Sequence, residues 1–153
     1  MATPEAQLPV AAKPTSPTRP RSALHDPESA ALWRQQLHVE IGPAGRVAVL
    51  RVAGDIDMLT LPLMCAALVA ALETRPAELV VDVSSVRFCG VRGFALLAAT
   101  ARTTATNEIG YAVTGVGPHL DRAAAQIWTD QPPARYPSIK AAFTAIRKRR
   151  QNG

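Results

Sequence analysis

The sequence predicts an α/β fold in which a mixed, mostly parallel sheet of about four to five strands packs with about four helices. Single apolar segments of strand length alternate with longer segments of helical periodicity, which is the pattern of parallel strands joined by helices. The first two apolar segments instead flank a turn at 42–45, Gly-Pro-Ala-Gly, which is typical of a hairpin. A chain of 153 residues, 48% of them hydrophobic, is long enough for one domain with a buried core.

Residues 1–32 are predicted to form a disordered leader. Six of the 13 prolines lie before residue 28, among few large apolar side chains and without periodicity. Such a segment buries too little apolar surface to offset the entropy lost on ordering. We therefore expect the folded domain at residues 33–147 and a basic tail at residues 148–153.

The domain is expected to open with a β-hairpin. Residues 37–41 alternate apolar and polar side chains, as a strand with one buried face does. Residues 47–53 are mostly apolar and rich in valine, so this strand is expected to be buried on both faces. The sequence Gly-Asp-Ile-Asp at 54–57 is expected to be a loop.

A helix is predicted from about residue 60 to residue 74. Thr60 is favoured at an N-cap, Pro62 suits a first turn, and Pro76 prevents continuation. Between Asp57 and Glu73 this segment has no charge, so no polar outer stripe is predicted. We expect either an exposed apolar patch or a cover, which could be the leader, a second copy or a partner protein.

Two further strand and helix units and a last helix complete the prediction. The units are strand 79–83, helix 91–106, strand 111–116 and helix 120–128, the last opened by Pro118. Ser138 is expected to cap the last helix after a loop that contains Pro132, Pro133 and Pro137. Binding sites in such folds tend to lie at the carboxyl ends of strands.

The net charge of +5 arises from the C-terminal end of the chain. Residues 135–153 contain six Lys and Arg and no acid, whereas the other 134 residues contain 11 Lys and Arg against 12 Asp and Glu. A basic face over the whole domain, as expected of a protein that binds nucleic acid directly, is not predicted. The basic end is expected to be a solvated helix end whose cations suit the helix dipole, although it could contact acidic partners.

The sequence contains no complete set of catalytic or metal-binding residues. Cys65 and Cys89 form no CxxC pair and have no metal-ligand spacing with the histidines. Asp55 and Asp57 could be paired catalytic carboxylates, but no histidine or serine is placed to complete the set. The glycines at 115–117 lack the third glycine of a dinucleotide-binding loop. We expect no enzyme activity, no metal and no cofactor.

The sequence favours a cytoplasmic protein. Two cysteines without a disulfide framework fit a reducing compartment, and the N-terminus lacks the apolar region of a signal peptide. The longest apolar run, 58–72, is interrupted and is shorter than the roughly 20 residues that a membrane span needs. No membrane span is therefore predicted.

Four motifs along residues 37–147 point to a known family. These are Gly54-Asp55-Ile56-Asp57 followed by Thr60 and Pro62, the strand and loop at 80–88, Gly93, and the strand at 113–116 before Pro118. In this order they resemble the motifs of STAS domains, the fold of bacterial anti-sigma factor antagonists. In that family, Gly93 would correspond to the glycine of the phosphorylation motif Asp-Ser-Ser-Gly-Leu.

The sequence departs from the family at the phosphorylation motif itself. Gly90-Val91-Arg92 takes the place of Asp-Ser-Ser, so Arg92 stands where the resemblance puts the phosphoacceptor serine. A phosphate at a helix N-terminus is favoured by the dipole and would repel an acidic partner, whereas an arginine is a fixed cation. No phosphorylated residue is therefore expected here. Arg92 could also be an exposed residue without a role, or it could bind an anionic ligand.

The resemblance implies a protein-interaction module that frees a sigma factor by binding an anti-sigma factor of the serine-kinase ATPase-like class, without catalysis. Its contact residues would be Asp55, Asp57, Gly90, Val91, Arg92 and Gly93. Two alternatives stay open: a STAS subunit of a stressosome or a lipid-transport ATPase complex, and a small-ligand sensor of flavodoxin-like shape. The uncharged helix is also compatible with a homodimer.

Overall fold

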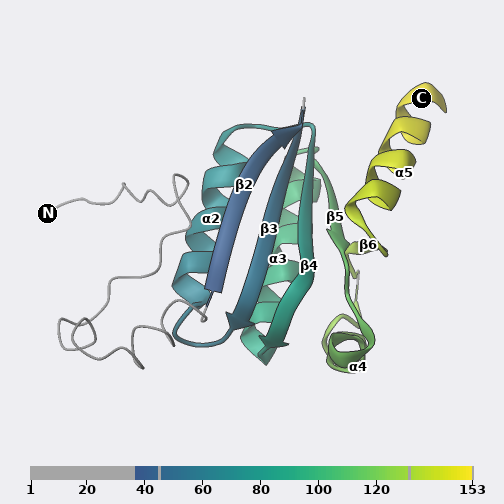
Figure 1. Cartoon of the computed structure of the whole chain (residues 1–153). Helices are drawn as coiled ribbons and strands as arrows, with labels where there is room; N and C mark the ends of the chain where they lie inside the picture. Colours follow the sequence, from purple (N-terminus) through teal and green to yellow (C-terminus); the bar gives the residue numbers. More distant parts are fainter. Residues whose placement is uncertain (1–36, 45, 131, 153) are drawn as a thin grey trace, which may run out of the picture.

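The computed structural model describes residues 37–152 except residues 45 and 131, so the predicted leader and residues 33–36 lie outside it (Figure 1). The elements in chain order are β2 (Leu37–Ala44), β3 (Val47–Ile56), α2 (Leu61–Glu73), β4 (Glu78–Cys89), α3 (Val91–Thr106), β5 (Gly110–Thr114), α4 (Pro118–Ile127), β6 (Ala134–Tyr136) and α5 (Ile139–Asn152).

The strands form one sheet in the order β2-β3-β4-β5-β6. β2 is antiparallel to β3, and the other three pairs are parallel. The predicted mixed, mostly parallel sheet is therefore confirmed, and so are four helices within the described residues. The predicted loop at 132–137 is wrong for residues 134–136, which pair with β5 as a short edge strand. The strand could not be predicted because prolines on both sides of it are typical of a loop.

Helices cover both faces of the sheet because successive residues of a strand point to opposite sides. Leu50 and Val81 lie in the larger cluster, which α2, α3 and α4 complete. Val49 and Val80, their neighbours in sequence, pack against Ile146 of α5 on the other face. The central strands are thus buried on both sides, as the run of valines in β3 predicts.

β3 and β4 are longer than the sequence predicts. Residues 54–56, predicted as part of a loop, continue β3 and pair with β4, which itself runs to Cys89 instead of residue 83. β3 and β4 stay paired along this length because their register shifts at two points, before Ala53 and after Gly54. Gly54 has φ 107°, a conformation that favours glycine, so this strand can kink where another residue would be strained.

The last helix includes residues 148–152, which the sequence predicts as part of a basic tail. Ser138 caps α5 as predicted, because its hydroxyl accepts a hydrogen bond from the Ala141 N–H at 3.1 Å. Near the other end of the helix, Arg149 forms an ion pair with Glu78 at 3.5 Å. The start of α5 is therefore capped and its far end is tied to β4, and most of its basic side chains face solvent.

Candidate functional site

The candidate site lies where β3 and β4 end, at the arrowheads of both strands in Figure 1. β3 leads into α2 through residues 57–60, and β4 leads into α3 through Gly90. The Gly90 N–H donates a hydrogen bond to the Ile56 carbonyl at 2.9 Å and so joins the two connections. This is the carboxyl edge of the parallel strands, where the fold class predicts a site.

A groove of about 380 Å³ opens at this edge, and we call it the contact groove. Its lining residues are Ile56, Asp57, Met58, Phe88, Gly90, Val91, Arg92 and Gly93. Five of the six contact residues inferred from the family motifs are among them, and Asp55 is not. The carboxylate of Asp55 instead forms an ion pair with Arg87 at 3.4 Å.

Asp57 holds the backbone of the β3–α2 connection in place. Its Oδ1 atom accepts hydrogen bonds from the N–H groups of Leu59 and Thr60, both at 3.0 Å. An aspartate that satisfies the free N–H groups ahead of a helix stabilises that start. Asp57 is therefore a structural residue of the groove wall, which agrees with its interpretation as a loop acid and not as a catalytic carboxylate.

Thr60 does not act as the predicted cap. It occupies the position before α2, but its buried hydroxyl makes no capping hydrogen bond to the helix. The hydroxyl donates to the Asp55 carbonyl at 2.8 Å and accepts from the Asp57 N–H at 2.9 Å. Thr60 therefore fixes the kinked end of β3, and the Asp57 side chain binds N–H groups that come just before α2.

Gly93 allows α3 to approach the end of β3 closely. A Cβ atom at this position would lie 2.7 Å from both Cys89 Sγ and Ile56 Cγ2, closer than real Cβ atoms come. The family motif keeps a glycine here, and the packing of this chain gives a physical reason for it. The glycine sets the position of the first turn of α3, which carries Val91 and Arg92.

Arg92 is exposed in that first turn. Gly90 is the N-cap, no side chain caps the helix, and no acidic residue lies in its first turn. A cation at the positive end of a helix dipole is unfavourable by about 0.3–1 kcal/mol. Within the described part of the chain, Arg92 forms no ion pair, so its charge is available to a partner.

The rim of the groove is apolar, which the sequence reasoning missed. Met58, Phe88 and Val91 are 66%, 53% and 68% exposed, and Leu59 beside them is as exposed as Met58. The sequence does contain a signal for Met58 and Leu59, because two neighbouring apolar residues stand in a connection that is expected to be polar. Phe88 could not be found in this way, because β4 is predicted to end at residue 83, whereas Val91 is already among the contact residues that the family motifs imply.

Neither Cys89 nor His119 shows a reactive arrangement with the other residues that the structure describes. Burial raises the pKa of the Cys89 thiol to about 12, so the thiolate needed for a redox reaction is scarce at neutral pH. His119 Nε2 lies 3.0 Å from the Val86 carbonyl, next to backbone and not next to an acid or a thiol. Among the residues that the structure describes, no three His, Cys, Asp or Glu side chains could together hold a metal ion.

None of the helices α2 to α5, as described here, combines the length and the apolar content that crossing a membrane would require.

Comparison with known proteins agrees with this architecture. The family model described as "Mlab, STAS domain" matches residues 39–131. The anti-sigma-F factor antagonist RsfB of Mycobacterium tuberculosis is 28% identical over 109 residues, which are 71% of this chain and 88% of RsfB.

Solved structures give the same result. The crystal structure of an anti-sigma factor antagonist from Mycobacterium paratuberculosis is 33% identical, with a TM-score of 0.67, over 74% of this chain and 96% of that one. A structure of a Moorella thermoacetica RsbS variant shares the fold at a TM-score of 0.64 and 14% identity, over 74% of this chain and 97% of that chain. With the family model, the related sequences and the sheet in agreement, the chain belongs to the STAS-domain family of anti-sigma factor antagonists.

Proposed function

We propose that this chain is a non-catalytic module that binds an anti-sigma factor through the contact groove and thereby frees a sigma factor. The similarity to anti-sigma factor antagonists supports this role. The observation that carries the proposal is that five residues inferred from family motifs line a single groove with an apolar rim. The expected partner is of the serine-kinase ATPase-like class, in the cytoplasm, and neither nucleic acid nor a cofactor takes part.

The groove suggests what the partner surface looks like. Three exposed apolar side chains, Met58, Phe88 and Val91, would leave water on binding, and such burial is a main source of affinity. Arg92 lies among them and favours a carboxylate on the partner. We therefore expect an apolar partner surface that carries an Asp or Glu opposite Arg92.

Arg92 also favours binding that is not switched off by phosphorylation of a serine. A guanidinium has no hydroxyl to accept a phosphoryl group, and its charge is fixed at every physiological pH. A partner kinase could not weaken binding by modifying residue 92, as it would in a chain with serine there. The module would then be regulated by its concentration or by another site.

The proposal can be tested by titrating the full chain against the anti-sigma factors of its own genome by calorimetry. Arg92→Glu should weaken binding about tenfold or more, because a charge-assisted contact becomes a repulsion. Lys140→Glu is the matched control, since it reverses an exposed charge on α5, on the other face of the sheet. Equal effects of the two substitutions, or no binding by any anti-sigma factor, would contradict the proposal.

A second candidate is a subunit of a larger assembly, and α2 favours it. This helix has no charge before Glu73, and its outer side exposes Cys65 and Val69, the latter 49% exposed. An exposed face without charge is compatible with a second contact surface. Native mass spectrometry of the full chain tests this candidate: a homo-oligomer that Val69→Lys dissociates would support it, and a monomer at all concentrations would contradict it.

A further inference from the structure

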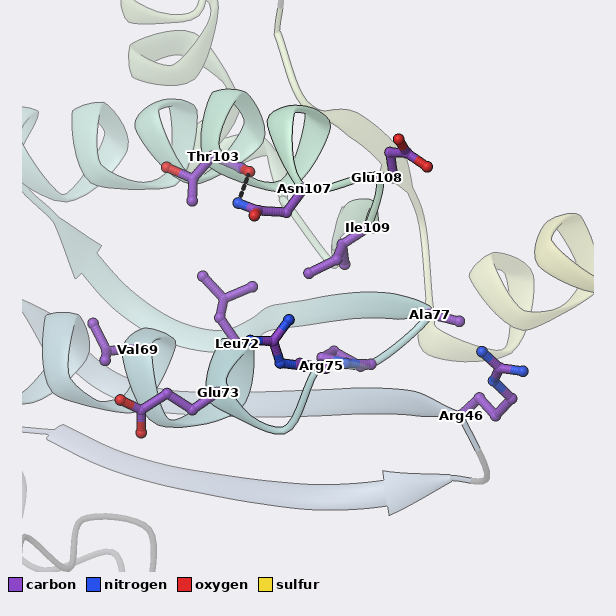
Figure 2. A pocket seen from close by; sticks show the side chains of 11 residues that line it. Arg46, Val69, Leu72, Glu73, Arg75, Ala77, Thr103, Asn107, Glu108 and Ile109 are labelled. Carbon is purple, nitrogen blue, oxygen red and sulfur yellow. Dashed lines mark hydrogen bonds between the residues drawn. The ribbon is translucent and has the colours of Figure 1, made fainter.

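A second groove, of about 580 Å³, lies at the opposite end of the sheet from the contact groove (Figure 2). It is bounded by the C-terminal ends of α2 and α3 and by the start of β4, and we call it the polar-end groove. Leu72 from α2 and Ile109 from the turn after α3 form part of its lining. The groove therefore offers an apolar surface between two helix ends.

Two arginines add positive charge to this groove. Arg46 comes from the β2–β3 turn and Arg75 from the connection between α2 and β4. Neither forms an ion pair with any residue in the described ranges. Figure 2 shows the Arg75 side chain extending beside Leu72 into the space between the two helices.

The two carboxylates that line the groove lie farther from its middle than Arg75 does. Glu73 and Glu108 also belong to the lining, but in Figure 2 both side chains point away from the middle of the groove. No ion pair within the described chain joins them to the arginines. Arg75 is therefore the cation that extends toward the middle of the groove, and Arg46 and the two acids lie at its edge (Figure 2).

Arg75 and Glu108, on the two sides of the groove, both have a left-handed backbone conformation. Arg75 follows the C-cap of α2 with φ 52°, and Glu108 follows the C-cap of α3 with φ 59°. Glycine is the residue that this left-handed position favours, because a side chain there is strained. Both residues therefore stand where glycine would fold more easily, so glycine can replace either one without a cost in backbone strain.

We propose that the polar-end groove binds a small organic anion. Its phosphate, sulfate or carboxylate group would contact Arg75, with Arg46 adding to the positive potential, and its apolar body would lie against Leu72 and Ile109. This site is separate from the contact groove, so it is independent of the proposed binding of an anti-sigma factor.

Two matched probes test the chemistry of the groove. 8-Anilinonaphthalene-1-sulfonate has an anionic group on an aromatic body, and N-phenyl-1-naphthylamine is the same body without the sulfonate. In fluorescence titrations of the full chain, the sulfonate should bind saturably, and the neutral probe should bind at least about tenfold more weakly. In amide NMR spectra, the sulfonate should shift residues 75–77 and 107–109 at lower concentrations than residues 90–93.

Two matched variants separate binding from folding. Arg75→Gly removes the cation and relieves the strained backbone, so affinity for the sulfonate should fall about tenfold or more while the melting temperature stays equal or rises. Glu108→Gly relieves the same kind of strain on the other side of the groove and should keep or increase that affinity. Unchanged affinity in Arg75→Gly, shifts centred on residues 90–93, or no saturable binding of the sulfonate would overturn the proposal.

Discussion

The indole N–H of Trp128 donates a hydrogen bond to the backbone carbonyl of Phe94 at 2.8 Å, and the two rings meet edge to face with centroids 5.5 Å apart. Trp128 is the C-cap residue of α4, and Phe94 lies in the first turns of α3. Both side chains are buried. This contact holds the start of α3, and with it the turn that carries Arg92, against the end of α4.

Replacing the indole should therefore loosen the base of the contact groove. We expect Trp128→Phe to lower the free energy of unfolding by about 1–3 kcal/mol, because a buried hydrogen bond is lost and a smaller ring leaves space. Urea denaturation followed by far-ultraviolet circular dichroism measures this change. An unchanged midpoint would mean that the hydrogen bond does not contribute to stability.

The close approach at Gly93 predicts a second effect on stability. Gly93→Ala places a Cβ atom 2.7 Å from Ile56 Cγ2 and should cost about 1–3 kcal/mol, because the helix or the strand end must move. Gly42→Ala is the control, since a Cβ atom there meets nothing within 4 Å. Thermal unfolding of both variants should show a lower melting temperature for Gly93→Ala alone.

The hydrogen bonds of Asp57 predict a loss of stability when its carboxylate is removed. Asp57→Ala leaves the N–H groups of Leu59 and Thr60 without their acceptor and should cost about 0.5–2 kcal/mol. Asp57→Asn keeps an oxygen in the same place and should recover most of this loss. Equal unfolding free energies for the alanine variant and the parent chain would exclude a structural role for the carboxylate.

The buried thiol predicts a loss of stability in alkali. Burial raises the pKa of Cys89 from 9.0 to about 12 in the folded chain, so between these values the unfolded chain gives up its proton first. Since the unfolded state then binds fewer protons, stability falls as the pH rises through this range, by at most about 1.4 kcal/mol per pH unit for one group.

Cys89→Ala should make that fall shallower without abolishing it, because burial also raises the pKa of Tyr111. Urea titrations between about pH 8 and about pH 11 compare the two chains. The same slope in both would show that the thiol titrates normally. Cys65 is exposed and should react with a thiol reagent in the native chain, whereas Cys89 should react only after unfolding.

The arginine at the phosphoacceptor position predicts a gain of function. Arg92→Ser puts a hydroxyl in the exposed first turn of α3, and an anti-sigma factor kinase that binds this chain should then transfer phosphate to it. Arg92→Ala removes the cation without adding a hydroxyl and is the control. Mass spectrometry should find phosphate on residue 92 of the serine variant alone, and equal labelling of all three chains would show that another residue is modified.

The layer architecture could be predicted from the sequence because it depends on periodicity. The valine runs of β3 and β4 and the helical spacing of 91–106 each indicate one type of element, and the chain agrees at each. Strand ends were less predictable. Residues 54–57 look like a loop because a glycine and two aspartates interrupt the apolar pattern, and only the register shift shows that pairing with β4 continues to Ile56.

The candidate site was predictable only where a motif exists for it. The residues from 90 to 93 come together with Asp57 as the family resemblance implies, whereas Asp55 does not line the groove and forms an ion pair with Arg87. The polar-end groove has no motif. Arg46 and Arg75 are far apart in sequence, and only the fold brings both to the start of β4.

The ion pair between Arg149 and Glu78 has a practical consequence. Glu78 is the first residue of β4 and Cys89 its last, so the C-terminal end of α5 is anchored a full strand length from the contact groove. An affinity tag, a fluorescent protein or an attachment to a sensor chip placed after α5 should thus leave the groove accessible to large proteins in solution.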